Sequence, residues 1–162
     1  MAKHKTVVID DKALGGLLTR AMKTAPKEAA KALTACVLDL AGESARRAPI
    51  EAGDLRNNCV GKVEETTVFE QQQSTGAAPA AKKQMTGTVG YSLPYALRQH
   101  EDLALRHDRT DGYRIMTGPN AGKTVNMVAG GEAKYLERPF NERKARYIQL
   151  FQKAVEKSLE HP

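Results

Sequence analysis

Apolar side chains recur at helical spacing near both ends of this chain of 162 residues, and this pattern constrains the fold more than any other feature. In residues 26–47 the apolar positions lie three or four apart, which predicts an amphipathic helix. The same spacing over about five turns after Pro139 predicts a second helix near the carboxyl end. This second stripe comprises Phe140, Lys144, Tyr147, Ile148, Phe151, Ala154, Val155 and Leu159. We therefore expect two amphipathic helices on either side of a middle without helical pattern.

The ends of the first helix carry local signals. Pro26 fits the first turn, where the missing N–H costs nothing. Arg46 and Arg47 suit the last turn, where positive charge opposes the helix dipole, and Pro49 prevents continuation. Alanine side chains make the helix thin, so that another element can approach it closely: Ala30, Ala32, Ala35, Ala41 and Ala45.

The residues before Pro26 are expected to form an arm with a short helix. Residues 5–9 predict a short strand, and an aspartate that follows them fits the N-cap of a helix. Two adjacent glycines lie within this helix, and each costs about 1 kcal/mol relative to alanine. We expect a short helix that ends before Pro26, with residues 1–24 as the arm. Its apolar stripe comprises Leu14, Leu17, Leu18, Ala21 and Met22.

The middle of the chain has the composition of strands and turns. Residues 51–54 predict a turn. Residues 55–69 are rich in Val, Thr and Phe and predict one or two strands. Residues 84–91 alternate well enough for another strand, and residues 95–100 predict a strand or a single turn.

Two polar stretches interrupt this middle. Residues 70–83 are small and polar, which is typical of a hairpin extension or a disordered loop. Farther on, two short apolar segments flank a turn at residues 118–122 and predict a hairpin of their own. We expect extended loops at 70–83 and 108–130.

Composition limits the class of protein. The length favours one domain, 1–162, and with 5% aromatic residues and no Trp its core rests on Leu, Ile, Val, Ala and Met. The formal charge is +6, which favours nucleic acid or an acidic partner, or simply reflects solvated helix faces. The chain shows no signal peptide and no membrane span, so we expect it to be made in a cytoplasm and to have no membrane partner.

The residue types used in catalysis or metal binding do not fall into a known pattern. Cys36 and Cys59 lack a metal-binding spacing; Cys36 is expected to be buried, and a disulfide between the two is left open. A phosphate-binding loop needs four residues between its glycines, but three separate Gly118 from Gly122. The second histidine that a zinc-protease helix would need after His100 is missing. We therefore expect no catalytic residues, no metal and no cofactor.

Three short stretches stand where elements should start or end. The first comprises Pro49, Ala52, Gly53, Leu55 and Arg56. The second comprises Tyr95, Ala96, His100 and Glu101. The third comprises Gly131, Ala133, Lys134, Tyr135, Leu136, Glu137 and Pro139. Gly53 would let the chain reverse from helix to sheet, and Leu55 would enter the core as the strand begins.

In this order the three stretches resemble motifs of the neck or tail-completion proteins of long-tailed bacteriophages, over roughly residues 26–160. One departure is the predicted hairpin at 108–130, where many relatives have a short loop. The resemblance implies an α+β fold, in which a long N-terminal helix and a C-terminal helix pack on a small antiparallel sheet.

The resemblance also implies a non-catalytic structural protein of the virion. Such proteins form rings, often hexameric, between the head connector and the tail, around the channel through which DNA passes. The implied partners are further copies of the chain, connector or head-completion proteins, and tail-terminator or tail-tube proteins. The residues that it marks as motif or interface candidates are Gly53, Leu55, Arg56, Tyr95, His100, Glu101, Lys134, Tyr135 and Leu136.

Two alternatives remain open. The positive charge favours a nucleic-acid-binding module, whose binding would weaken steeply with salt. The candidate DNA-facing loop residues are Lys82, Lys83, Arg106, Arg109 and Arg114. A small nuclease-like enzyme that uses His100, Glu101 and His107 is the less favoured alternative, because acid–base catalysis requires these groups to converge on one pocket.

Overall fold

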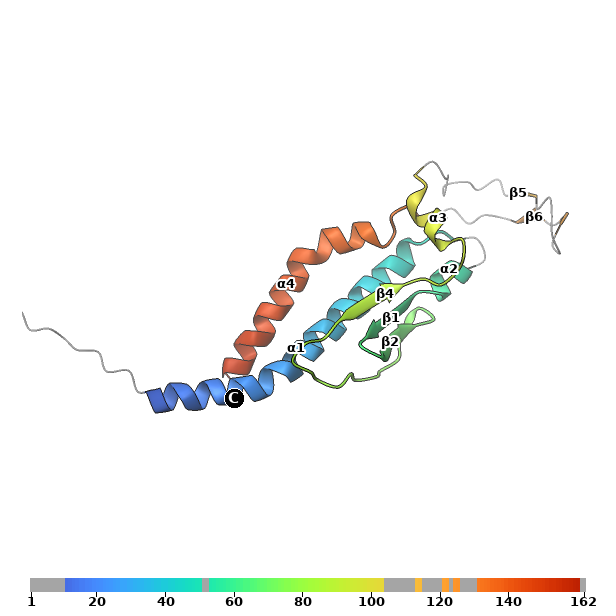
Figure 1. Ribbon diagram of the computed structural model, residues 1–162. Helices are drawn as coiled ribbons and strands as arrows, with labels where there is room; N and C mark the ends of the chain where they lie inside the picture. Colours follow the sequence, from blue (N-terminus) through green and yellow to red (C-terminus); the bar gives the residue numbers. More distant parts are fainter. Residues whose placement is uncertain are drawn as a thin grey trace, which may run out of the picture.

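The computed structural model describes residues 11–50, 53–103, 113–114, 121–122, 124–125 and 131–160. It confirms the α+β class: a long N-terminal helix and a C-terminal helix accompany a small antiparallel sheet (Figure 1). The elements are α1 (Asp11–Arg47), α2 (Asp54–Asn57), β1 (Val60–Val63), β2 (Thr66–Glu70), β3 (Gln73–Ser74), β4 (Gly87–Gly90), α3 (Ala96–Glu101), β5 (Tyr113–Arg114), β6 (Thr124–Val125) and α4 (Glu137–Glu160).

Helix α1 is continuous, so the prediction of a separate short helix before Pro26 was wrong. Pro26 lies inside α1 and cannot donate a hydrogen bond to the carbonyl four residues before it. Figure 1 shows α1 bending in its N-terminal third, as expected for a helix with an internal proline. Contacts with α4 support the helix here: Ala21 is buried, and the Thr24 hydroxyl donates to the Ser158 carbonyl at 3.2 Å. These contacts offset the local cost of the proline.

The main sheet has four strands in the order β3-β2-β1-β4, all antiparallel. β4 therefore forms one edge, and its Val89 pairs with Gly61 of β1. The strand predicted to begin at Leu55 begins at Val60 instead, because Asp54–Asn57 forms the short helix α2. Leu55 is buried as expected, but it reaches the core from a helix.

The sheet packs closely on α1. Val37 of α1 lies in a buried cluster with Val63 and Val68. An ideal Cβ on Gly87 of β4 would lie 2.6 Å from a methyl carbon of Val37, so only glycine allows this approach. Farther along α1, a second cluster joins Ala41, Ala45, Cys59 and Phe69. The alanine-rich helix thus contacts the sheet over several turns, and α1 lies between the sheet and α4 (Figure 1).

The remaining predictions have mixed outcomes. Residues 95–100 belong mostly to the helix α3 and form no strand. The hairpin predicted within 108–130 is confirmed where it is described, since β5 pairs with β6 antiparallel. The predicted strand at 5–9 lies outside the described residues. Within the described ranges, no helix has the length and apolar character needed to cross a bilayer.

Candidate functional site

The three sequence stretches meet in one buried cluster, which we call the motif junction: Ala48, Leu55, Ala96 and Tyr135. These residues come from the end of α1, from α2, from α3 and from the segment before α4. Tyr91, Leu93 and Leu136 pack around them. Residues that the sequence separates by almost ninety positions therefore form one joint between the helices and the sheet.

Tyr135 is the centre of the motif junction, with 1% of its surface exposed. Its hydroxyl donates to the Ala96 carbonyl at 2.8 Å, so α3 is fixed to the segment before α4. The Tyr135 ring meets the rings of Tyr91 and His100 edge to face, with 5.0 Å between the centroids in each pair. Burial disfavours the phenolate and raises the pKa of Tyr135 to about 12. Tyr135 therefore acts as a neutral hydrogen-bond donor.

Backbone geometry in the motif junction explains two of the glycines. Gly53 has φ 84°, a left-handed conformation that favours glycine, and it leads into the helix α2 and not directly into a strand as predicted. Gly131 has φ 106°, and a Cβ placed on it would lie 2.3 Å from the Cα atom of Pro49. The Arg56 guanidinium donates through Nε to the Ala48 carbonyl at 2.9 Å. These contacts hold the last segment and α2 against the end of α1.

Three charged side chains pair with one another beside the motif junction. The Lys134 ammonium contacts the carboxylates of Glu101 and Glu137, the latter at 2.9 Å. The Lys134 ammonium lowers the pKa of Glu101, and His100 adds to this effect. Glu101 in turn raises the pKa of Lys134. Tyr95 and Leu136, the other candidates of these stretches, are exposed and half-buried, respectively.

Both ring nitrogens of His100 have contacts within the chain. Nδ1 lies 2.7 Å from Oε1 of Glu101, and Nε2 faces the backbone N–H of Glu137 at 3.4 Å. The second contact makes Nε2 an acceptor, so Nδ1 carries the hydrogen and donates a hydrogen bond to Glu101. His107, the third member of the nuclease alternative, lies outside the described residues. In this arrangement His100 connects α3 with α4.

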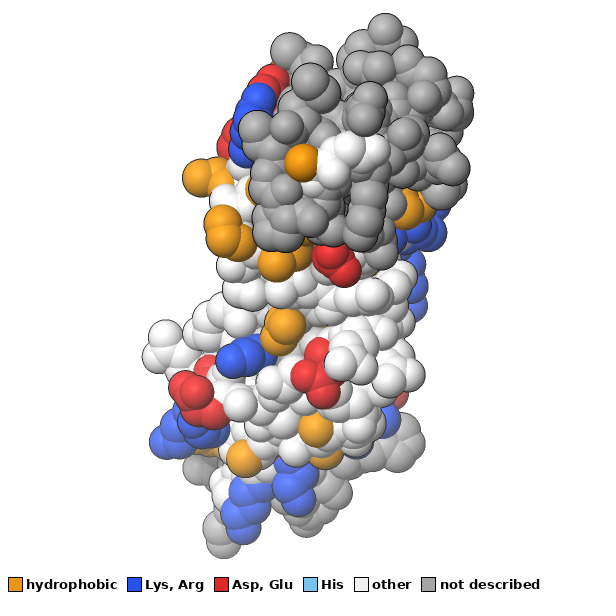
Figure 2. All heavy atoms as spheres, turned by 90° about the vertical axis from the view of Figure 1, so that its right-hand side faces the viewer, with side chains coloured by type: hydrophobic (Ala, Val, Ile, Leu, Met, Phe, Trp, Pro, Cys, Tyr) orange, Lys and Arg blue, Asp and Glu red, His pale blue; other side chains and the backbone are white. Residues whose placement is uncertain are grey.

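The candidate DNA-facing residues do not form one described surface. The Lys82 ammonium pairs with the Glu64 carboxylate at 3.2 Å, and Lys83 is exposed beside it. Arg106 and Arg109 lie outside the described residues, and for Arg114 only the backbone, in β5, is described. Figure 2 shows Lys and Arg side chains interspersed with Asp and Glu side chains on the face that it displays.

One side of α4 exposes apolar residues, and the sequence pattern did not indicate this exposure. Tyr147, Ala154 and Ser158 of α4 are buried. Four apolar residues of the predicted stripe stay exposed and form what we call the apolar rim: Phe140, Ile148, Val155 and Leu159. Ile148 is 59% exposed. The stripe of α4 is thus wider than the surface that α1 covers.

A groove runs beside the apolar rim, between α4, α1 and the edge strand β4. Its volume is about 200 Å³. The lining residues are uncharged: Leu33, Cys36, Val37, Leu40, Gly87, Val89, Phe140, Tyr147 and Phe151. We call this hollow the α4–β4 groove.

Cys36, which lines the groove, and Cys59 are both buried free thiols, so they form no disulfide.

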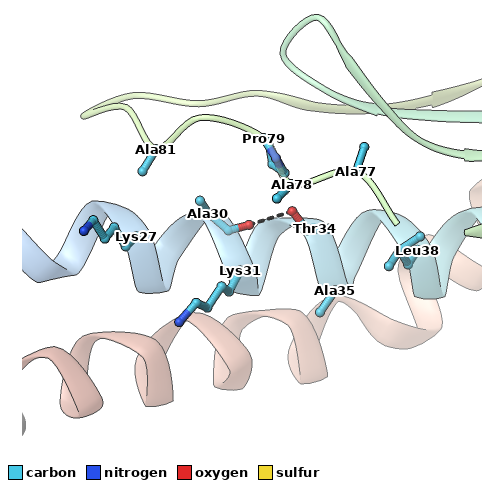
Figure 3. A pocket seen from close by; sticks show the side chains of 10 residues that line it. All are labelled: Lys27, Ala30, Lys31, Thr34, Ala35, Leu38, Ala77, Ala78, Pro79 and Ala81. Atoms are coloured by element: carbon cyan, nitrogen blue, oxygen red, sulfur yellow. Dashed lines mark hydrogen bonds between the residues drawn. The ribbon is translucent and has the colours of Figure 1, made fainter. Parts of the chain in front are cut away.

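A second, larger groove of about 560 Å³ lies where the chain between β3 and β4 passes over α1 (Figure 3). Ala30, Ala78, Pro79 and Ala81 point into it, and Lys27 and Lys31 border it on α1. The Lys31 ammonium pairs with Glu28 at 2.7 Å. The polar stretch 70–83, predicted as an extended loop, therefore lies in part along α1.

Comparisons with known proteins identify no relative: no protein-family model, no curated protein and no solved structure matches this chain. Within the described ranges, no group of three or more His, Cys, Asp and Glu side chains is placed to hold a metal ion. We take the apolar rim with the α4–β4 groove as the candidate functional site, because exposed apolar side chains lie there beside a hollow with uncharged lining.

Proposed function

We propose that this chain is a non-catalytic structural protein of the bacteriophage head–tail interface. In this proposal it forms a ring, six-fold as in the proteins that it resembles, which joins the connector or head-completion protein to the tail-terminator or tail-tube protein. Its place is the neck or tail of the virion, around the DNA channel. The resemblance of the three stretches motivates the proposal.

The observation that carries it is the apolar rim. Large apolar patches left exposed beside a groove are typical of protein–protein contact sites. Burying a fully exposed side chain of this size contributes about 1.5–3 kcal/mol. Ile148 and Phe140 are about half-exposed, so each adds about half of that amount, and several together favour association. The motif junction supports a structural role as well, because its side chains are engaged with one another.

Complementation of a phage that lacks this gene tests the proposal. We expect wild-type protein to restore infectious particles and Ile148→Glu to fail, because a carboxylate at this position opposes burial of the apolar rim. Gln149→Glu adds the same charge to the next, already polar residue of α4 and should complement normally. Normal particles in the absence of the gene would contradict the proposed function.

A nucleic-acid-binding module is the second candidate, and the net charge of +6 favours it. Such binding should weaken steeply as salt increases, because counterions are released from the phosphates. Lys83→Glu should then reduce DNA binding more than Lys82→Glu, because Lys82 already pairs with Glu64 at 3.2 Å. Absence of DNA binding at low salt would dismiss this candidate.

A further inference from the structure

The N-terminal end of α1 projects past the other described elements (Figure 1). Figure 1 shows the first turns of α1 extending beyond the C-terminal end of α4. Where α1 passes this end of α4, Ala21 is buried and the Thr24 hydroxyl donates to the Ser158 carbonyl at 3.2 Å. Residues 11–22, which we call the projecting end of α1, are about 18 Å long at the rise of an α-helix.

The projecting end exposes an apolar side. Met22 is 74% exposed and Leu18 is 49% exposed. The two residues lie four apart and therefore occupy neighbouring positions on one helix face. Lys23 lies about 140° around the helix from Leu18, so its charge does not interrupt this face. An exposed apolar helix face that projects from a domain is an unfavourable surface unless another element covers it.

The α4–β4 groove and the apolar rim form an apolar surface on which such a helix face can pack. The groove is lined by uncharged side chains, and the rim extends from Phe140 to Leu159, about 28 Å along α4. A helical segment of about 18 Å fits within this length, and helices commonly lay an apolar face into such grooves. Ile148 lies near the centre of the rim, where a covering helix would meet it.

We propose that the projecting end of α1 in one copy packs on the α4–β4 groove and apolar rim of a second copy. Two unlike surfaces of one chain then contact each other, which makes the interface heterologous. A heterologous interface repeats from copy to copy and closes into a ring when the rotation permits. This inference rests on the proposed ring function and adds the pair of surfaces that would build the ring.

Site-directed cross-linking of the full-length chain tests the proposed pair. Met22→Cys marks the projecting end, and Ile148→Cys marks the apolar rim. The two variants are mixed, treated with a short bis-maleimide and compared with each variant alone. The native Cys36 and Cys59 are buried, so wild-type protein treated in the same way gives the background. Gln149→Cys replaces Ile148→Cys as the matched control, because Gln149 is exposed on another side of α4.

We expect covalent dimers in the mixture of Met22→Cys with Ile148→Cys, at least tenfold above either variant alone and above the Gln149→Cys control. Met22→Glu should weaken self-association at least tenfold, whereas Lys23→Glu should change it little. Dimers from Ile148→Cys alone would indicate that α4 pairs with α4 of the second copy and would overturn the inference. Oligomers that give no Met22–Ile148 product would also overturn it while leaving the ring function intact. If the protein forms neither oligomers nor complexes with tail or connector proteins, the proposed function fails as well.

Discussion

Single residues at the motif junction determine how the last part of the chain joins the first. Gly131 passes so close to Pro49 that no side chain fits between them. The backbone N–H of Glu132 then donates to the Arg47 carbonyl at 2.9 Å, and Tyr135 follows at the centre of the junction. The position of Tyr135 therefore depends on a glycine that makes no side-chain contact of its own.

Gly131→Ala should be strongly destabilising. The added Cβ would lie 2.3 Å from the Cα atom of Pro49, and φ 106° is strained for alanine. We expect a loss of roughly 2–4 kcal/mol in the free energy of unfolding, measured by urea denaturation. Gly90→Ala is the matched control, because a Cβ on Gly90 meets nothing within 4 Å. Equal effects of the two substitutions would contradict the described backbone path.

Protonation of Glu43 makes the free energy of unfolding depend on pH in the acid range. Hydrogen bonds from Arg46 and then Arg47 lower the pKa of Glu43 from 4.5 to about 2. A carboxyl group with a lowered folded-state pKa stabilises the protein fully above pH 4.5 and progressively less as the pH falls toward 2. We expect a contribution of about 1–2 kcal/mol, reduced by nearby water from the value that the full pKa difference implies.

The measurement is the free energy of unfolding of wild-type protein and Glu43→Gln between neutral pH and pH 2. The difference between the two proteins should be constant above pH 5 or so and should shrink as the pH falls further. A difference that grows on acidification would show that the Glu43 carboxylate is not stabilised by its arginine neighbours.

At the scale of elements, an ion-pair network joins α1 to α4. The Arg143 guanidinium lies 2.9 Å from a carboxylate oxygen of Asp39 and 3.1 Å from one of Glu43. The Tyr147 hydroxyl donates to Asp39 at 2.9 Å. Arg47 of α1 reaches back to Glu142 of α4 at 2.6 Å. Charged and polar side chains thus link α1 to α4 at several points along both helices.

Arg143→Met should loosen α4 from α1. It leaves Asp39 and Glu43 without this partner, and we expect a loss of roughly 1–2 kcal/mol in the free energy of unfolding, measured by thermal denaturation. Arg146→Met is the control, because Arg146 is more exposed and lies 3.6 Å from Asp39. Its effect should stay below about 0.5 kcal/mol, as for exposed ion pairs in general. A larger loss in Arg146→Met than in Arg143→Met would contradict the network.

Helical periodicity predicted much of α1 and α4, because it records which side of a helix is apolar. The Val, Thr and Phe content of residues 55–69 predicted β1 and β2, and alternation predicted β4. These local signals failed where long-range contacts outweigh them. Pro26 was expected to begin a helix, but the contact between Thr24 and Ser158 supports a helix that continues through it. Leu55 was expected in a strand, but its burial in the motif junction is compatible with a helical turn.

At the scale of the whole molecule, the sequence indicated part of the candidate site. The three stretches were singled out, but nothing in the sequence showed that Leu55, Ala96 and Tyr135 would share one cluster. The apolar rim lay within the predicted helical stripe of α4, which did not indicate which of its residues would be covered. Spacing shows which side of α4 is apolar, whereas the covered fraction depends on the width of the neighbouring helix. This part therefore required the structure.

In the proposed function the chain is an assembly component whose apolar rim is covered by another copy or partner. Light scattering at several concentrations, with and without tail-tube or connector protein, measures whether this association occurs. We predict a mass of several copies or a stoichiometric complex for wild-type protein and for Gln149→Glu, and a monomer for Ile148→Glu. A wild-type chain that stays monomeric at every concentration and forms no complex would contradict the claim.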